Sequence, residues 1–337
     1  MKERITMRYQ NQEQMIKEGF PSIHTLILGD VMVDEYVTGK VSRISPEAPI
    51  PVFNYGSSKR IAGGASNVAH NVAKLGSSVS MMGIVGEDAS GEWLREHLQK
   101  AQIDTSGLLS QNCRPTTVKR RFATKSQQLL RVDMEDASPV SAVIEEKWLE
   151  LLEQKAAHIQ AVIISDYKKG VLASPGFIKK VLHICEKHQI ITAIDSKSPY
   201  IESFAGASFV KPNNLELEQA VGIKIKDEAS LDAAGKCYLQ RSQAKALLVT
   251  RGAKGISVFA QDRERMDYPS QAVQVYDVTG AGDTVISTVT LCAACGMPLE
   301  EAAVLGNAAA EIVISKVGTV PVTAQELLNK IKGRNKE

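Results

Sequence analysis

Short runs of apolar, often β-branched residues recur along the chain, and polar residues or glycine bound each of them. Runs of this length and composition are typical of strands that are buried on both faces of a sheet. The runs that predict strands are residues 24–30, 79–86, 161–166, 190–195, 207–212, 246–252 and 255–260.

Between many of these runs, apolar residues fall three or four positions apart, which is the spacing of one helix face. Segments with this spacing predict helices at residues 66–76, 90–102, 142–157 and 174–189. Strands that alternate with helices imply a mainly parallel sheet with helices on both faces. The pattern therefore predicts a fold of the α/β class.

Two stretches, residues 36–61 and 115–135, break this alternation because they contain strands and turns without a helical segment. Pro46, Pro49 and Pro51 favour an edge position for the first stretch, since proline cannot donate to a sheet ladder. We expect the two stretches to pair into a small separate sheet that covers the active edge as a lid and contacts a second copy of the chain in a homodimer. A plain surface hairpin is the alternative.

Charge and hydropathy narrow the classes of partner. The chain has 337 residues, and its 40 Lys and Arg against 38 Asp and Glu give a net charge of only +2. A net charge this small gives no overall positive electrostatic potential that would attract a polyanion, so nucleic acid is not an expected partner. No apolar run approaches the roughly 18 residues that span a bilayer, and residues 1–22 are polar. We therefore expect no membrane association and a cytoplasmic location.

The cysteines are too few and too scattered for a disulfide framework, so we expect reduced thiols. Cys292 and Cys295 form a C-x-x-C pair inside the apolar stretch 284–297, which favours core packing over redox or zinc chemistry. The histidines show no metal-binding spacing.

Charged side chains stand where several predicted strands end. Asp30, Asp166, Asp195 and Lys211 each come at or just after the end of an apolar run. Ligands of open α/β sheets bind beyond the carboxyl ends of the strands, so these residues are candidates for a site. Helix capping and turn formation are the alternative roles for the carboxylates.

The stretch with the clearest chemistry is Asp277-Val-Thr-Gly-Ala-Gly-Asp-Thr, which runs into a predicted helix. Gly280, Ala281 and Gly282 allow successive backbone N–H groups to face one concavity at the positive end of the helix dipole, which suits phosphate oxygens. Asp283, beside this anion hole, is a candidate general base for a hydroxyl that attacks a γ-phosphate. A helix N-cap is the alternative role of Asp283.

A second glycine-rich stretch runs from Gly63 to Asn67 and precedes a predicted helix. Gly63 and Gly64 allow a ligand to approach the backbone closely, and Asn67 can donate to and accept from sugar hydroxyls. Asp30 and Asp34 can accept further hydrogen bonds from such hydroxyls. Together these residues predict a polyol site.

A third stretch places Asn213 and Glu216 three residues apart at a helix start. Both are candidates to hold Mg²⁺ through water, because this ion keeps much of its hydration. The chain contains no P-loop, protein-kinase or dinucleotide-binding motif, so these classes of nucleotide-binding protein are disfavoured.

The three motifs follow one another along the chain as residues 63–67, 213–216 and 277–284. In this order they resemble those of the ribokinase/PfkB family of sugar kinases, over about residues 23–330. The resemblance implies a three-layer α/β/α domain with a small β lid, which we place at residues 23–332 between an N-terminal extension, residues 1–22, and a polar tail, residues 333–337. It implies ATP and Mg²⁺ as cofactors, Asp283 as the catalytic base and residues 280–282 as the anion hole.

The same resemblance implies further residues of the cofactor site. Lys197, in Asp195-Ser-Lys197, matches the lysine of the family segment Asp-Pro-Lys. Asp277 and Thr279 match a site that holds a monovalent cation such as K⁺ in relatives. The remaining residues implied for the ATP site are Thr250, Arg251, Gly252 and Asn307.

Within the family, residues 29–52, 127–135, 165–172 and 275–286 resemble the D-glycero-β-D-manno-heptose 7-phosphate kinases. These enzymes transfer a phosphoryl group from ATP to the anomeric hydroxyl, which gives the 1,7-bisphosphate, and they feed ADP-heptose synthesis for the lipopolysaccharide core. Many carry a fused nucleotidyltransferase domain with an H-x-G-H motif. The motif is absent here, so we expect a kinase-only version, with adenylyl transfer by another protein.

A 7-phosphate requires a cationic partner. Arg131 is the first candidate because it lies inside the matching stretch 127–135, and Lys169 and Arg43 are further candidates. Solvated lid charge is the alternative, favoured for Arg120 and Arg121. The competing functions are another sugar, sugar-phosphate or nucleoside kinase of the family, and a sugar-binding protein without catalytic activity.

Overall fold

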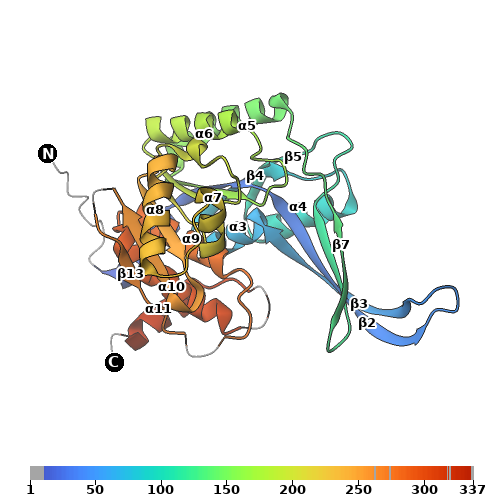
Figure 1. Ribbon diagram of the computed structural model, residues 1–337. Helices are drawn as coiled ribbons and strands as arrows, with labels where there is room; N and C mark the ends of the chain where they lie inside the picture. Colours follow the sequence, from blue (N-terminus) through green and yellow to red (C-terminus); the bar gives the residue numbers. More distant parts are fainter. Residues whose placement is uncertain (1–10, 262, 273–274, 317, 319, 335–337) are drawn as a thin grey trace.

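The computed structural model describes residues 11–261, 263–272, 275–316, 318 and 320–334. Within them, a nine-stranded sheet lies between two layers of helices, and a separate four-stranded sheet projects from one side of this body (Figure 1). The three-layer α/β/α architecture with a small β-sheet lid is thereby confirmed.

The main sheet has the strand order β13-β12-β11-β10-β9-β8-β1-β4-β5. Pairing is parallel from β5 to β11 and antiparallel at β12 and β13. The strands are β1 (His24–Gly29), β4 (Ser78–Ile84), β5 (Asp104–Leu109), β8 (Ala161–Asp166), β9 (Ile191–Ser196), β10 (Phe209–Val210), β11 (Ala246–Thr250), β12 (Ile256–Ala260) and β13 (Met266–Tyr268).

Every strand expected from an apolar run is present, whereas β5 and β13 were not predicted. β5 is half exposed, with the sequence Asp-Thr-Ser-Gly-Leu-Leu, and β13 has only three residues. Neither therefore carries the continuous apolar run of a buried strand.

Helices cover both faces of the sheet, and each layer buries its own hydrophobic core. One layer consists of α3 (Ala65–Lys74), α4 (Ala89–Lys100), α9 (Ala281–Ala294), α10 (Leu299–Ile314) and α11 (Ala324–Arg334). The other consists of α5 (Ala142–Lys155), α6 (Pro175–Lys187), α7 (Asn214–Val221) and α8 (Glu228–Ser242). Adjacent residues of β1 alternate between the two cores: Ile27 packs with the first layer, and Leu26 and Leu28 with the second.

The described part of the N-terminal extension, residues 11–22, is a short irregular helix: α1 (Gln12–Gln14), a π-helical turn (Met15–Gly19) and α2 (Phe20–Ser22). Met15, Ile16 and Phe20 are buried in the core that α9, α10 and α11 share. This segment is thus packed against the first helix layer.

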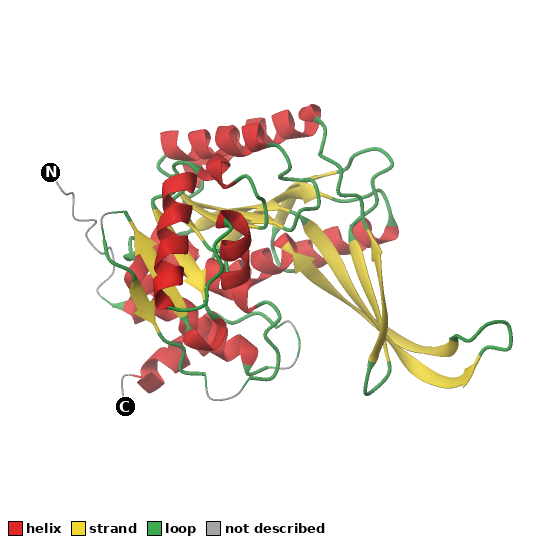
Figure 2. Ribbon diagram, in the orientation of Figure 1, coloured by secondary structure: helices red, strands yellow, loops and turns green. Residues whose placement is uncertain are grey.

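The lid consists of β2 (Val31–Ile44), β3 (Pro51–Gly64), β6 (Val118–Ala123) and β7 (Gln128–Met134), in the order β3-β2-β6-β7. Figure 2 shows these strands extending well beyond the body. The expected pairing of two helix-free stretches is confirmed, and Pro51 opens an edge strand. The lid begins earlier than expected, because β2 starts at Val31, directly after Asp30.

Two further expectations concern the C-x-x-C pair and membrane-spanning helices. Cys292 and Cys295 are buried on and just after α9 and form no disulfide, as the core interpretation of the C-x-x-C pair requires. None of the helices in the described ranges is both long and apolar enough to cross a membrane.

Candidate active site

A cavity of about 240 Å³ lies where β8, β9, β10 and β11 end and α9 begins. This is the edge at which parallel α/β sheets bind their ligands. Its lining residues are Asp166, Tyr167, Asp195, Lys197, Lys211, Asn213, Glu216, Thr250, Gly280, Gly282 and Asp283. The structure therefore brings together residues of two of the motifs, 213–216 and 277–284, with residues at or just after the ends of the strands.

Asp283 lies in the first turn of α9 and is only 8% exposed. Nδ2 of Asn67 donates to its Oδ2 at 2.7 Å, and the hydroxyl of Tyr167 donates to its Oδ1 at 2.9 Å. Asn67 comes from α3, which packs against α9, and the hydroxyl of Thr284 donates to Oδ1 of Asn71 at 2.9 Å between the same helices. The carboxylate is therefore held at the junction of two helices.

Burial raises the pKa of Asp283 from 3.8 to about 6. The hydrogen bond from Asn67 opposes this shift, the charge of Asp195 adds to it, and the contacts with Tyr167 and Lys211 oppose it again. A carboxylate with such a pKa is ionised above neutral pH and is a stronger base than an exposed one, which suits proton removal from a hydroxyl.

The residues before Asp283 form the start of α9. Gly280 has φ +82°, a left-handed conformation that side chains rarely adopt, and it turns the chain into the helix. Among the described residues, the N–H groups of Gly282 and Asp283 have no acceptor, as is usual in a first helical turn. These donors and the helix dipole make the cavity floor suitable for a phosphate group.

A lysine ammonium adjoins this helix start. Nζ of Lys211 would lie 3.3 Å from a Cβ at Gly282, and it forms an ion pair with Oδ2 of Asp195 at 2.8 Å. Lys211 is buried, but the adjacent negative charges, Asp195 first among them, outweigh desolvation and raise the pKa of its ammonium. Lys211 therefore remains a cation inside the cavity.

Asn213 and Glu216 form a reciprocal cap at the start of α7. Oε2 of Glu216 accepts the N–H of Asn213 at 2.9 Å, and Oδ1 of Asn213 accepts the N–H of Glu216 at 2.9 Å. Glu216 lines the cavity, and no described group donates to its Oε1. The capping role and a ligand role are compatible, because one carboxylate oxygen serves each.

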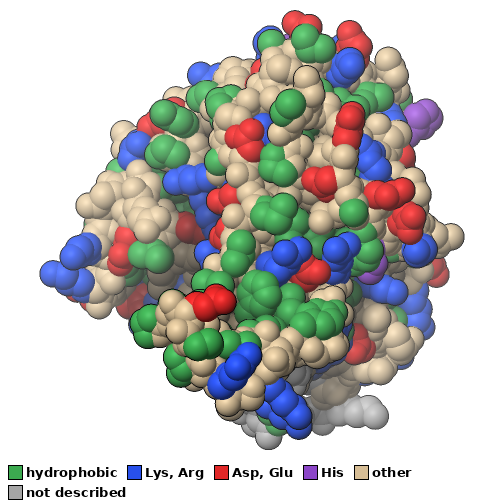
Figure 3. Space-filling model, turned by 90° about the vertical axis from the view of Figure 1, so that its right-hand side faces the viewer, with side chains coloured by type: hydrophobic (Ala, Val, Ile, Leu, Met, Phe, Trp, Pro, Cys, Tyr) green, Lys and Arg blue, Asp and Glu red, His purple; other side chains and the backbone are tan. Residues whose placement is uncertain are grey.

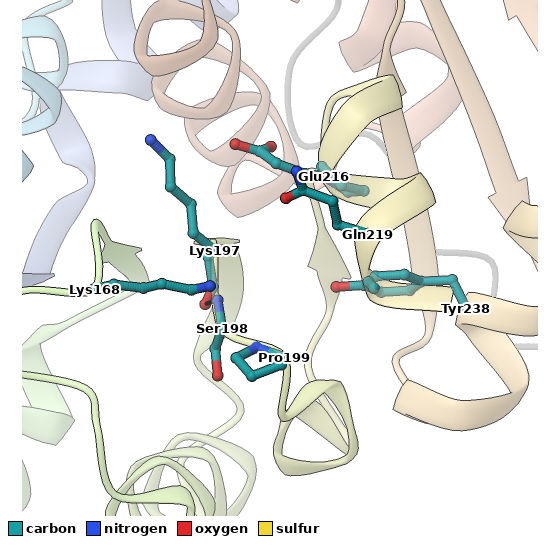
Figure 4. A pocket seen from close by; sticks show the side chains of 10 residues that line it. Lys168, Lys197, Ser198, Pro199, Glu216, Gln219 and Tyr238 are labelled. Atoms are coloured by element: carbon teal, nitrogen blue, oxygen red, sulfur yellow. Dashed lines mark hydrogen bonds between the residues drawn. The ribbon is translucent and has the colours of Figure 1, made fainter. Parts of the chain in front are cut away.

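A smaller pocket of about 100 Å³ adjoins the cavity and shares Lys197 and Glu216 with it. Figure 4 shows the hydroxyl of Tyr238 and the ammonium of Lys168 directed into this side pocket, whereas Lys197 extends away from it. The ammonium of Lys197 lies 4.7 Å from the centre of the Tyr167 ring. Lys197 thus lines the larger cavity, where its ammonium contacts the ring of Tyr167.

Asp30 is buried between β1 and the lid, and its contacts are to backbone. Oδ2 accepts the N–H groups of Tyr167 and Lys169 at 2.8 and 2.9 Å, and Oδ1 accepts that of Val171 at 3.2 Å. Burial raises the pKa of Asp30 to about 6. The structure thus uses the carboxylate of Asp30 to hold the loop after β8, although we expected it to accept from a sugar.

Gly63 and Gly64 lie at the end of β3, beside Asp30 and Asp34. A Cβ at Gly63 would lie 2.2 Å from Oδ2 of Asp34, and one at Gly64 would lie 2.4 Å from the carbonyl oxygen of Asp30. Gly64 also has φ +57°. Glycine at these positions therefore allows the protein's own residues Asp30 and Asp34, rather than a ligand, to lie close to the backbone.

Two predicted phosphate-binding cations, one on the lid and one on the loop after β8, are engaged in ion pairs. Arg131 contacts Asp133 at 2.9 Å, with half of its side chain exposed, and Lys169 contacts Glu135 at 2.7 Å. Arg121, the register partner of Arg131, pairs with Asp34 at 2.5 Å.

Arg43 lies elsewhere on the lid. It is exposed and pairs in register with Val52 near the hairpin tip, nine residues beyond Asp34 on β2. A strand rises about 3.3 Å per residue, which places Arg43 roughly 30 Å along the strand from Asp34. The structure does not bring Arg43 together with the other lid candidates.

The residues expected at the ATP site divide into two groups. Thr250 lines the cavity, and Gly252 follows it with φ +58°. The guanidinium of Arg251 pairs with Glu228 at 2.5 Å, and Nδ2 of Asn307 donates to the carbonyl of Tyr268 at 2.8 Å. These two side chains therefore join elements at the edge of the sheet.

The sequence analysis gave two candidate metal positions: Asn213 and Glu216 for Mg²⁺, and Asp277 and Thr279 for a monovalent cation. Oδ1 of Asp277 accepts the N–H of Thr279 at 2.9 Å in the loop before α9. The described ranges contain no cluster of three His, Cys, Asp or Glu side chains that could hold a metal ion. Mg²⁺ does not require such a cluster, because it takes one or two carboxylates together with substrate phosphates and water.

Four cavity residues had no assigned role in the sequence analysis. Asp166, Asp195 and Lys211 were noted only as strand-end residues, and Tyr167 was not singled out. The position of Tyr167, directly after the carboxylate that ends β8, is a signal that could have identified it.

Comparison with known proteins agrees with this geometry. A family model described as pfkB family carbohydrate kinase matches residues 26–325. The chain is 38% identical over 309 residues to Bifunctional protein HldE of Geobacter metallireducens, and 39% identical over 302 residues to the protein of the same name from Wolinella succinogenes. These alignments cover 92% and 90% of this chain but only 63% of each relative.

Solved structures share the fold at lower identity. Ribokinase of Arabidopsis thaliana, solved with ribose and ATP, has a TM-score of 0.75 at 22% identity and covers 92% of this chain and 98% of its own. Phosphofructokinase-2 of Escherichia coli, solved with potassium, has a TM-score of 0.74 at 20% identity and covers 93% and 99%. Together with the family match, these findings show that the chain is a phosphotransferase with an alcohol group as acceptor and that it belongs to the pfkB family of carbohydrate kinases.

Proposed function

We propose that the protein transfers the γ-phosphoryl group of ATP to the anomeric hydroxyl of D-glycero-β-D-manno-heptose 7-phosphate, a step towards ADP-heptose for the lipopolysaccharide core. The observation that carries the reaction type is the buried Asp283, held by two donors beside the start of α9 and the ammonium of Lys211. The heptose is supported by the likeness to proteins named HldE over nine-tenths of the chain.

The side chains of the cavity suit such a transfer. Asp283 accepts the proton of the acceptor hydroxyl as its oxygen attacks the γ-phosphorus, and the bond to the leaving phosphate oxygen breaks. The free N–H groups at the start of α9 and the ammonium of Lys211 stabilise the negative charge on the transferring group. Burial of both charged residues strengthens these interactions, because little water competes.

Glu216 and Asn213 would hold Mg²⁺ through water, and Thr250, Gly252, Arg251 and Asn307 would surround the nucleotide. Oε1 of Glu216, which has no described donor, suits this role. Bound Mg²⁺ neutralises charge on the nucleotide phosphates. Asp277 and Thr279 are the proposed contacts of a monovalent cation, and potassium was present in the related phosphofructokinase-2 structure.

The 7-phosphate would bind through Arg131 on the lid and Lys169 on the loop after β8. Each already pairs with a carboxylate, Asp133 and Glu135 respectively, so a phosphate exchanges one anionic partner for another. An Arg guanidinium can bind phosphate through two parallel hydrogen bonds. The present contact of Arg131 with Asp133 is made through Nε, so a phosphate bound by two nitrogens would be held more fully. Asp34 and Asn67 would contact sugar hydroxyls, and the absence of a side chain at Gly63 allows the carboxylate of Asp34 to lie against the end of β3.

We also propose a homodimer formed through the lid. Leu130, Val132 and Met134 lie on one face of β7, and they are 56%, 38% and 45% exposed. Figure 3 looks onto the side from which the lid projects and shows hydrophobic side chains there among Lys and Arg. An exposed apolar sheet face of this kind favours a partner, and a second copy would offer the same face in return. The cysteines of the described residues form no disulfide, which fits a cytoplasmic location.

The test is turnover with Mg-ATP on a panel of heptose 7-phosphate, fructose 6-phosphate, ribose, fructose and adenosine. ADP release and the mass of the product identify the acceptor, and Asp283→Asn serves as the inactive control. We expect turnover confined to the heptose phosphate. Turnover on another acceptor instead would select a different kinase of the family. No turnover on any acceptor, with sugar binding retained, would select the non-catalytic alternative.

A further inference from the structure

The carboxylate of Asp283 has a second protein donor besides Asn67. Tyr167 follows β8 directly, lines the catalytic cavity and places its hydroxyl 2.9 Å from Oδ1, while Nδ2 of Asn67 lies 2.7 Å from Oδ2. A carboxylate oxygen has two lone pairs, so each oxygen retains one acceptor position. The two donors therefore fix the plane of the carboxylate and leave it able to receive a substrate hydroxyl.

Tyr167 is itself held at both ends. Its backbone N–H donates to Oδ2 of Asp30 at 2.8 Å, and the ammonium of Lys197 lies over its ring at 4.7 Å from the centre. Burial raises the pKa of the phenol well above its usual value, and the charge of Asp283 adds to the shift. The hydroxyl therefore stays protonated at every working pH, so it donates to Asp283 and does not act as a base.

We propose that Tyr167 is a positioning residue for phosphoryl transfer, whose hydroxyl orients the Asp283 carboxylate towards the acceptor and favours its ionised form. The inference rests on the proposed function, because it takes Asp283 as the base. It adds a group that acts on the base rather than on the substrate, and it assigns a role to the tyrosine of the loop Asp166-Tyr-Lys-Lys-Gly170.

The test is the pH dependence of kcat in Tyr167→Phe. This substitution keeps the ring and removes only the hydroxyl, so the carboxylate loses one hydrogen bond to its charged form. Such a bond is worth enough to shift a pKa by about one to two units. We expect the acidic limb of the profile to move to higher pH by that amount. The loss of kcat is then larger at pH 6.5 than at pH 9, while KM for Mg-ATP is unchanged.

Tyr238→Phe is the matched control. Tyr238 is also a buried tyrosine, but its hydroxyl is directed into the side pocket and forms no hydrogen bond with a described residue. Its loss leaves the acidic limb in place. A carbon-13 NMR titration of the side-chain carboxyl groups provides a readout that needs no turnover, with the Asp283 signal assigned by its absence from Asp283→Asn.

The outcomes separate the inference from the function on which it rests. The inference is supported if the acidic limb of the kcat profile and the pKa of Asp283 both shift to higher pH in Tyr167→Phe and neither shifts in Tyr238→Phe. If Tyr167→Phe lowers kcat equally at all pH values, or not at all, and Asp283 titrates as in the wild type, the inference is overturned although the kinase remains. If Asp283→Asn turns over normally, the proposed base is wrong, and the inference falls with it.

Discussion

Lys211 and Asp195 form an ion pair inside the catalytic cavity, with 2.8 Å between Nζ and Oδ2. The side chain of Lys211 is 4% exposed, and that of Asp195 is 17% exposed. The pair joins the end of β9 to the residue just after β10. It also carries the cationic group nearest to the start of α9 among those described above, so we expect both stability and turnover to depend on it.

Lys211→Met is expected to destabilise the protein and to abolish most of its activity. Removal of one partner leaves Asp195 as an uncompensated charge, which costs about 3 kcal/mol. Denaturant unfolding and steady-state kinetics measure the two effects. The double variant Lys211→Met with Asp195→Asn removes the stranded charge, so it should recover stability without recovering turnover. Recovery of both would show that Lys211 has only a structural role.

Asp283→Asn is expected to lower kcat by roughly 10²–10⁴, the usual contribution of a general base. At pH 8 the same variant should be more stable than the wild type. The folded protein raises the pKa of Asp283 from 3.8 to about 6, so the ionised carboxylate opposes folding above pH 6. One pKa unit corresponds to 1.36 kcal/mol, which gives a gain of about 2 to 3 kcal/mol.

This gain has a defined pH window. As the pH falls from about 6 towards 3.8, the carboxylate becomes protonated in the folded state and its cost disappears, so the two proteins converge. Asp30, whose pKa is also raised, contributes equally to both and cancels in the comparison. Thermal unfolding at pH 8, 6 and 4 measures the difference. A gain that is the same at all three values would contradict the raised pKa.

Arg131→Ala is expected to raise KM for a phosphorylated sugar roughly tenfold with little change in kcat, since it removes binding shared by the ground and transition states. Arg263→Ala is the control, because Arg263 is an exposed arginine that pairs with Glu300 on the body. KM for Mg-ATP should not change in either variant. An unaltered KM for the sugar phosphate in Arg131→Ala would move the phosphate site to another cation, such as Lys169.

Leu130→Asp is expected to convert a dimer into a monomer of 36.6 kDa, because a charge on the apolar lid face cannot be buried against a second copy. Light scattering after size-exclusion chromatography measures the mass. Val143→Asp is the control, since Val143 is equally exposed but lies on α5 of the body. A wild-type protein that is already monomeric, or a dimer that survives in Leu130→Asp, would refute the lid interface.

Much of the fold follows from local patterns in the sequence. Continuous apolar runs identified the buried strands because a strand covered on both faces has no polar side. The prolines and the absence of helical spacing identified the lid. The half-exposed β5 and the three-residue β13 were missed, because neither carries such a run. The packing of Met15, Ile16 and Phe20 was missed because they lie in a segment that is polar overall.

The candidate site was predictable in its motifs but not in its pairings. The glycine-rich stretch and Asp283 are adjacent in sequence, so their geometry is local. The hydrogen bond between Asn67 and Asp283 spans 216 positions and depends on how α3 packs on α9. The same limit applies to Asp30: sequence shows an acceptor, whereas the fold directs three backbone N–H groups to it.

Asp30 also has a mechanical consequence. It is the single residue between β1 of the body and β2 of the lid, its carbonyl accepts the N–H of Ala65 at 2.9 Å, and its carboxylate is fixed to the loop after β8. The lid strands are therefore anchored at their base. If the lid rotates about this anchor, its displacement is smallest at Val31 and largest at the hairpin tip, residues 45–50, and the rotation pulls on the loop that carries Tyr167.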